Sequence, residues 1–423
     1  MRLRNQLLAI LLLGLFGVFG FYYFRIWVNP KPFAVIVFLG DGLTAGDLTA
    51  ARQFEGGADH RLTVQTFPHT ALVSNHANDF AVPDDASAAT ALATGVKVNN
   101  GSIAIDPNGR PLQSLLDLAR ERGRSVGVIT NGSLADATMA AFYAHAPGTG
   151  DPAALAKQFA DAKIDVALGG GALDFLPEGK DGRRKDRRDL LAELQNKGRT
   201  VVRTKADLEN APVFGTSSLV GLFAGGNLAF AGQIEAGSGQ PSLSDMVRRA
   251  IEFLEYHQGG YFLVVDASLI TRAAEQNQGE RAIAETIELD HAIATALRYA
   301  GPKALIVAVG KHATGGMVLN GYPLRSDHGV ALLGKNPAGY PAITWSTGPN
   351  GPAASGTPTA IGTPAPKPSP TPAPRTTEPS AVSSPTAVNN AEDVLAIGIG
   401  PGSQEVTGFL DNTQVFRILE KNL

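Results

Sequence analysis

The sequence contains no cysteine, and its charges almost cancel, with 36 lysines and arginines against 39 acidic residues. The absence of thiols excludes disulfides, thiolate metal sites and a cysteine nucleophile. The charge balance argues against a nucleic-acid partner, and the basic run at residues 183–188 has no aromatic side chain to stack on bases. Only 18% of the residues are charged and 44% are hydrophobic, which is enough apolar material for one large core.

A long uncharged run lies close to the N-terminus. Residues 6–23 carry no charge and follow Arg2 and Arg4, and their number is close to that needed to cross a membrane. A cleavable signal peptide usually has a shorter apolar core, of about 7–15 residues, and a small-residue cleavage site. We therefore predict a membrane anchor over residues 1–28, with a signal peptide as the alternative. The positive-inside rule then places the bulk of the chain outside the cytoplasm.

A stretch rich in proline, threonine and serine covers residues 352–387. It holds ten of the 27 prolines and only three charged residues, so it cannot bury a core. We predict a disordered insertion that interrupts one domain, whose two parts are residues 29–351 and 388–423.

The rest of the chain alternates between short apolar runs and helical patterns. The runs predict buried strands at Phe33–Leu39, Ser125–Thr130, Val166–Leu168, Tyr261–Val265 and Ala304–Val309. Apolar residues recur at three and four in Leu112–Arg122, Asp151–Asp161, Ser242–His257 and Arg281–Ala300. This alternation predicts an α/β sandwich with a mainly parallel central sheet.

Polar residues stand at the ends of several predicted strands. Asp41 follows the first strand, Asp136 lies shortly after the second, and Asp266 closes the fourth. Lys311 and His312 follow the fifth. Ligands collect beyond the C-terminal ends of parallel strands, so these residues are site candidates, although an aspartate beside glycine is more commonly a loop or cap residue.

Several motifs occur in the order found in the alkaline phosphatase family and resemble that family. They are Phe38-Leu39-Gly40-Asp41-Gly42, Val82-Pro83-Asp84 with Thr90-Ala91-Leu92-Ala93-Thr94-Gly95-Val96-Lys97, Asp136-Ala137-Thr138, Leu168-Gly169-Gly170-Gly171, Thr314-Gly315-Gly316, Gly400-Pro401-Gly402 and Asp411-Asn412-Thr413. The resemblance spans residues 33–423 apart from the insertion. It implies a three-layer α/β sandwich that hydrolyses phosphate monoesters with a serine nucleophile, two zinc ions and one magnesium ion, and it makes a homodimer possible.

The nucleophile position implied by the resemblance falls on Asp85 instead of a serine. A count without gaps back from Gly95 gives this position. A carboxylate accepts phosphoryl groups in other enzymes, but here it would oppose a dianionic substrate. Ser87 is two residues further along, a rotation of about 200° on a helix, so it should face away.

The ligands of one zinc position fall on Thr271, Glu275 and Asn389, where the resemblance implies an aspartate and two histidines. Neutral amide and hydroxyl groups bind zinc weakly, so this position should be lost. The arginine that grips phosphate in the family falls on Thr149.

The other zinc position keeps Asp41 and His312, but Lys311 replaces an aspartate. A charged ammonium offers only donors and should repel a divalent ion. We predict that Lys311 occupies the space of this second zinc and pairs with Asp41 and Asp85, since a buried charge is tolerated when it is paired.

Four residues match the magnesium ligands implied by the resemblance: Asp41, Asp136, Thr138 and Asp266. Oxygen donors of this kind suit a hard cation. The alternative is a structural role, in which they join strand ends through hydrogen bonds.

These departures favour a family scaffold without two-zinc chemistry. It would be a pseudoenzyme that binds a phosphorylated small molecule or a protein partner. The alternative is a working metal-dependent phosphomonoesterase that uses Asp85 or a water molecule at an altered site. The order of motifs from Asp41 to Asp411 argues against a third possibility, another hydrolase or transferase of the superfamily.

Overall fold

The structure is a computed structural model that describes residues 2–23, 33–148, 150–213, 218–235, 237–257, 259–320, 333–335, 339–352 and 378–423. Thr149, a predicted site residue, and residues 353–377 of the predicted insertion lie outside the described residues.

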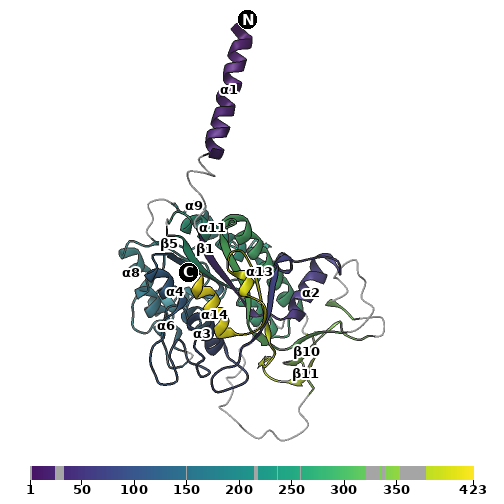
Figure 1. Ribbon diagram of the computed structural model, residues 1–423. Coiled ribbons are helices and arrows are strands. Elements are labelled where there is room, and N and C mark those ends of the chain that lie inside the picture. The colour runs from purple at the N-terminus through teal and green to yellow at the C-terminus, as the bar shows by residue number, and fades with distance from the viewer. Residues whose placement is uncertain are drawn as a thin grey trace.

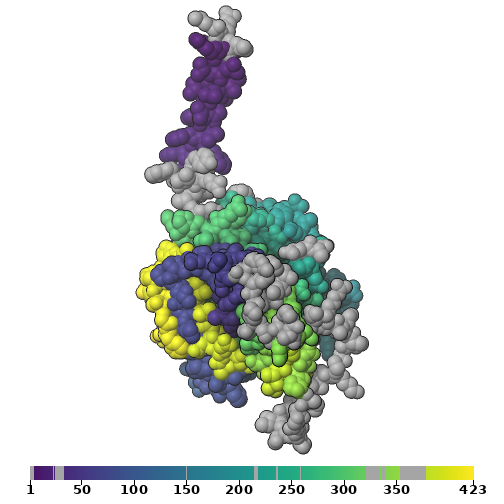
Figure 2. All heavy atoms as spheres, turned by 90° about the vertical axis from the view of Figure 1, so that its right-hand side faces the viewer, coloured from purple at the N-terminus to yellow at the C-terminus, as the bar shows by residue number. Residues whose placement is uncertain are grey.

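A mainly parallel sheet forms the centre of the molecule. Its strands lie in the order β14-β2-β13-β8-β1-β7-β3-β4-β6-β5, and β12 also pairs with β8. Among the described strands of this sheet, only β13 and β12 are antiparallel to their neighbours. The strands are β1 (Ala34–Gly42), β2 (His69–Ser74), β3 (Ser125–Ser133), β4 (Val166–Gly170), β5 (Thr200–Val202), β6 (Leu219–Leu222), β7 (Tyr261–Asp266), β8 (Ala304–Thr314), β12 (Asn389–Asn390), β13 (Val394–Ile399) and β14 (Gly408–Asp411). Figure 2 shows the blue segment that contains β2 beside the yellow C-terminal part of the chain.

Helices cover both faces of this sheet, which gives three layers (Figure 1). Alternate residues of β1 enter two different cores, Val35 and Val37 on one face and Ile36 and Phe38 on the other. The first core is covered by α3 (Asp85–Thr94), α4 (Leu115–Glu121), α5 (Ala137–Ala140), α6 (Pro152–Asp161), α7 (Ala172–Phe175), α8 (Leu190–Asn196) and α14 (Asn412–Lys421). The second is covered by α2 (Ala45–Gly56), α9 (Lys205–Asn210), α11 (Leu243–Leu254), α12 (Leu269–Ala274) and α13 (Gly279–Ala300). The predicted α/β sandwich is confirmed.

All five predicted strands are present, but β8 extends further than expected. It continues to Thr314, because Ala313 and Thr314 pair with β12. Lys311 and His312 therefore lie inside the strand, buried on both faces, and not after it as the sequence suggested.

Helix α3 begins with a capping box. The Asp84 carboxylate accepts from the Ser87 backbone N–H at 2.8 Å, and Ser87 Oγ accepts from the Asp84 N–H at 3.2 Å. Gly95 ends the helix with φ of 70°, a left-handed conformation that favours glycine. The capping box fixes Asp85 as the first helical residue and occupies Ser87 in the cap.

A small second sheet corrects the predicted boundary of the insertion. Strands β9 (Met317–Leu319), β10 (Ile343–Gly348) and β11 (Ser380–Ser383) pair in the order β11-β10-β9. Glu378 Oε2 accepts from the Gly279 N–H at 2.8 Å and from the Trp345 indole N–H at 3.1 Å. Folded structure therefore includes Glu378 and does not begin only at residue 388. Within residues 378–383, Glu378 accepts hydrogen bonds from buried donors and β11 pairs with β10.

Helix α1 (Arg2–Tyr23) lies outside the folded body in both views (Figure 1, Figure 2). Its segment Arg4–Phe21 is long and apolar enough to cross a membrane, and none of that segment is buried against the rest of the protein. A signal sequence near the N-terminus has the same properties.

Candidate active site

The predicted site residues meet at the C-terminal edge of the central sheet. Asp41 ends β1, Asp85 begins α3, and Thr138 lies in the short helix α5 after β3. Lys311 and His312 come from the extended part of β8. Five positions that are up to 271 residues apart in the sequence therefore form one cluster.

The ammonium of Lys311 lies at the centre of this cluster. Its Nζ is 2.9 Å from Asp41 Oδ1 and 2.6 Å from Asp85 Oδ1, and it donates to Thr138 Oγ1 at 2.6 Å. The ammonium thus donates two hydrogen bonds, to Asp85 and Thr138, and forms an ion pair with Asp41, although the side chain is fully buried. Burial lowers the pKa of Lys311, but Asp41, Asp85 and Asp266 outweigh it and raise that pKa. The predicted pairing with Asp41 and Asp85 is present; the bond to Thr138 was not predicted.

The imidazole of His312 uses both of its nitrogens in hydrogen bonds. Asn389 Nδ2 donates to the Pro83 carbonyl at 3.1 Å, so Asn389 Oδ1 faces the Thr314 hydroxyl, which donates to it at 2.8 Å. The Thr314 hydroxyl also contacts Nδ1 of His312 at 3.2 Å, and Nε2 contacts Asp85 Oδ1 at 2.7 Å. His312 is therefore held in place by contacts with both Thr314 and Asp85.

The carboxylate of Asp85 is held in its charged form. Burial raises its pKa, but Lys311, His312 and Arg272 outweigh that effect and keep the pKa well below its usual range. A carboxylate that is bound by two donors on one oxygen is a poor nucleophile for a phosphate ester.

Arg272 is a site residue that the sequence analysis missed. Its NH2 lies 3.8 Å from Asp85 Oδ2 and 3.9 Å from Asp136 Oδ2, and its NH1 bonds Glu275 Oε1 at 2.9 Å. The side chain is 31% exposed. The sequence feature that could have identified Arg272 is its position next to Thr271, in the segment expected to carry zinc ligands.

The three residues at the first zinc position do not form a ligand set. Glu275 pairs with Arg272, and Asn389 is held by Thr314 and a backbone carbonyl. Thr271 is buried, and its hydroxyl has no hydrogen-bond partner among the described residues. A zinc ion needs about four N, O or S donors at about 2 Å, so these residues do not fit it.

The two remaining candidate magnesium ligands face different partners. Asp266 Oδ2 accepts from Thr130 Oγ1 at 2.7 Å, and burial, with the charge of Asp41, raises the pKa of Asp266 to about 8. Asp136 is about one third exposed and faces Arg272.

One group of three acidic or histidine side chains could hold a metal ion within the described part of the chain. The ligand atoms of Asp41, Asp85 and His312 lie within 4.8 Å of one another. A metal ion at this position would lie against the Lys311 ammonium, which bonds the same two carboxylate oxygens. The second zinc therefore does not fit the arrangement in this structure either.

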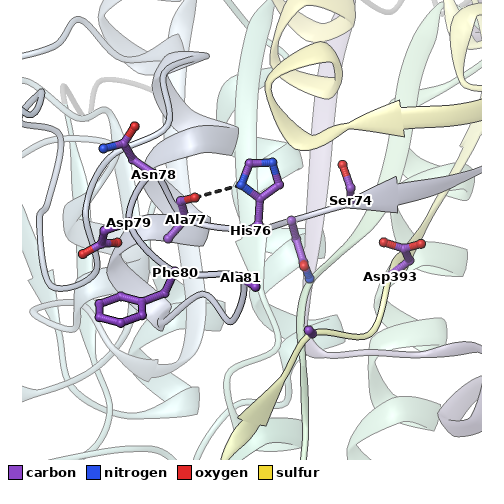
Figure 3. A pocket seen from close by; sticks show the side chains of 10 residues that line it. Ser74, His76, Ala77, Asn78, Asp79, Phe80, Ala81 and Asp393 are labelled. Atoms are coloured by element: carbon purple, nitrogen blue, oxygen red, sulfur yellow. Dashed lines mark hydrogen bonds between the residues drawn. The ribbon is translucent and has the colours of Figure 1, made fainter.

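A hollow of about 470 Å³ borders the strand that carries the cluster (Figure 3). It is lined by the segment from Ser74 to Ala81 and by Ala391 and Asp393. Asn75 in its wall donates to the Lys311 carbonyl at 3.4 Å. Figure 3 shows the His76 ring bonded to the Ala77 carbonyl, so this histidine is engaged locally.

Comparison with known proteins points to one family. Residues 34–423 match the family described as "Alkaline phosphatase". Alkaline phosphatase 4 of Bacillus subtilis (strain 168) is 33% identical over 313 residues, which cover 71% of this chain and 65% of that protein. Alkaline phosphatase 3 of the same organism is 31% identical over 296 residues, which cover 67% and 61%. The chain thus spans less than two thirds of the length of these relatives.

Solved structures show the same fold. The alkaline phosphatase of the Antarctic bacterium TAB5 superposes with a TM-score of 0.71 at 22% identity, over 93% of this chain and 98% of that one. The alkaline phosphatase of Thermus thermophilus gives a TM-score of 0.70 at 24% identity, over 95% and 94%.

Proposed function

This chain belongs to the alkaline phosphatase family, and we propose that it keeps the family scaffold without the family's two-zinc hydrolysis of phosphate monoesters. It acts as a pseudoenzyme with a binding role. Hydrolysis through Asp85 or a water molecule is the less favoured alternative, because neither zinc position fits the side chains that the structure describes there.

The position of the Lys311 ammonium carries this proposal. Two zinc ions would activate the nucleophile and neutralise the phosphate. Here one fixed ammonium bonds Asp85 Oδ1 at 2.6 Å and Asp41 Oδ1 at 2.9 Å, the oxygens that would otherwise face a metal. The ammonium supplies positive charge to both carboxylates at the place where an ion would otherwise do so.

The binding partner stays a prediction, either a phosphorylated small molecule or a protein. Arg272 supports the first, because its side chain is partly exposed and its NH2 lies 3.8 Å or more from Asp85 and Asp136. Those separations are too long for direct hydrogen bonds, so donors remain for an anion. Glu275, which already pairs with NH1, competes with such a ligand.

The location that we propose is outside the cytoplasm, with α1 as an uncleaved anchor. The exposed apolar face of the Arg4–Phe21 segment supports it. Protease treatment of intact and opened cells tests it: the folded part should be cut in intact cells and should sediment with membranes. Release of a soluble chain that begins after α1 would instead indicate a signal peptide.

Activity of the purified full-length chain in detergent tests the loss of catalysis. An aryl phosphate is offered with and without Zn²⁺ and Mg²⁺, and alkaline phosphatase 4 of Bacillus subtilis is assayed in parallel as the working relative. We expect no metal-dependent turnover and fewer than two zinc ions per chain by elemental analysis. Metal-dependent hydrolysis that Asp85→Ala abolishes would refute the proposal.

A further inference from the structure

The contact of the Lys311 ammonium with Thr138 indicates which of the family's metal ions the ammonium replaces, the second zinc or the magnesium. The family resemblance assigns Asp41 to both the second zinc and the magnesium ion. Thr138, in contrast, matches the magnesium set alone. Lys311 Nζ bonds Thr138 Oγ1 at 2.6 Å, as short as its contact with Asp85.

A second magnesium-set residue is also electrostatically coupled to this ammonium. The carboxyl of Asp266 is among the groups that raise the pKa of Lys311, and Asp266 Oδ1 has no hydrogen-bond partner among the described residues. Asp41 and Thr138 thus contact Nζ directly, and Asp266 acts on it through its charge. These are three of the four residues that match the magnesium ligands.

At the second zinc position, another side chain, His312, contacts the same two carboxylates. His312 Nε2 lies 2.7 Å from Asp85 Oδ1 and 3.1 Å from Asp41 Oδ1, and these three atoms still form a compact group. His312 Nε2 thus lies within contact distance of both carboxylates. Lys311 contacts these two carboxylates as well, but its contact with Thr138 reaches a residue that belongs to the magnesium set alone.

We propose that Lys311 is a covalently attached substitute for the family's magnesium ion, and that removing its side chain exposes a latent magnesium site at Asp41, Thr138 and Asp266. This inference rests on the proposed function in one respect: both assign the family's metal-ligand positions to residues of this chain. Magnesium takes oxygen ligands at about 2.1 Å and keeps several waters, so it needs the volume that the lysine side chain now fills.

Thermal unfolding of the full-length chain in detergent, with and without millimolar Mg²⁺, tests this proposal. Lys311→Ala removes both the charge and the volume, whereas Lys311→Met removes the charge and keeps most of the volume. We expect Mg²⁺ at about 100 times its Kd to raise the Tm of Lys311→Ala by roughly 5 °C. Wild type and Lys311→Met should show no shift.

Two further variants locate the effect. The double variant Lys311→Ala with Thr138→Val should lose the magnesium shift, because it lacks a ligand that only the magnesium set contains. Lys97→Ala is the matched control, since Lys97 also pairs with an aspartate, Asp411, at 2.9 Å but lies outside the cluster. If Lys311→Ala aggregates without metal, its soluble yield with Mg²⁺, compared with that of Lys97→Ala, gives the same comparison.

Three results would overturn the proposal. One is a magnesium shift in wild type that Thr138→Val removes. Another is a folded Lys311→Ala variant without any magnesium response. The third is stabilisation of that variant by Zn²⁺ and not Mg²⁺, which would place Lys311 at the second zinc. Zinc-dependent hydrolysis by wild type would refute the proposed function alone and is measured separately.

Discussion

The two zinc positions of the family have changed in opposite ways in this chain. At the first, Thr271 and Asn389 are neutral, and Glu275 has turned to a neighbouring arginine. At the second, the buried Asp41 and the partly buried Asp85 remain and a lysine compensates them. The difference shows that a position can lose its charges and become ordinary packing, but that buried acids which lose a metal need another cation.

The largest effect on this comparison is expected when the positive charge of Lys311 is removed from the second position. Lys311→Met leaves the buried Asp41 and the partly buried Asp85 with fewer counter-charges, and we expect it to lower the free energy of unfolding by about 3–5 kcal/mol. Urea unfolding followed by circular dichroism measures this. A loss below about 1 kcal/mol would show that the cluster does not depend on its lysine.

Glu285 is a buried acid that pairs with no cation among the described residues, so it provides a reference for both zinc positions. Among the residues that the structure describes, Glu285 in α13 accepts hydrogen bonds only from the backbone of Ala231, in α10 (Ala231–Glu235), and from the Asn131 amide. Burial raises the pKa of Glu285 to about 8, above its usual value, so its protonated form stabilises the fold at low pH. This contribution is lost as the pH rises to about 8, and we expect unfolding free energy to fall by roughly 3 kcal/mol from pH 5 to 8.

Glu285→Gln does not titrate and should flatten this pH dependence. Urea unfolding at several pH values measures both slopes. An unchanged slope in the variant would assign the pH dependence to other groups, the Lys311 cluster among them.

Restoring only the nucleophile tests whether the first position is truly lost. Asp85→Ser supplies the family's hydroxyl but no zinc ligands at Thr271 or Asn389, so we expect no metal-dependent turnover of an aryl phosphate. The variant also weakens the contact with Lys311, which we expect to cost about 1–3 kcal/mol in stability. Zinc-dependent activity in Asp85→Ser would mean that the first position still binds metal.

The smallest effect is expected at the first position itself. The Thr271 hydroxyl is buried without a hydrogen-bond partner among the described residues, so Thr271→Val should change the unfolding free energy by less than about 1 kcal/mol. The same urea experiment measures it. A loss as large as that of Lys311→Met would remove the contrast between the two positions.

The fold could be predicted further than the site. The strands β1, β3, β4, β7 and β8 were predictable because each is a buried apolar run. The part of β8 past Val309 was not, because it pairs with the end of β1 and with a two-residue strand 75 residues later. Lys311 was predictable from charge compensation. Its bond to Thr138 was not, because no pattern in the sequence places α5 above β8.

Arg272 shows a different limit. A helical residue between two expected ligand positions has no period or motif of its own, and its contacts with Asp85, Asp136 and Glu275 join three separate segments. Sequence spacing orders positions along a chain, but it does not measure distances across the sheet edge where these segments meet.

The two segments that flank the proline-rich stretch lie side by side in the small sheet. The Ser380 N–H bonds the Asn350 carbonyl at 3.4 Å, and β11 runs beside β10. Doubling the length of a connection whose ends are already held together adds only about 0.6 kcal/mol of closure entropy. This point is therefore a natural place for evolution to lengthen or shorten the chain, and for an experimenter to graft a reporter domain without disturbing the buried ammonium.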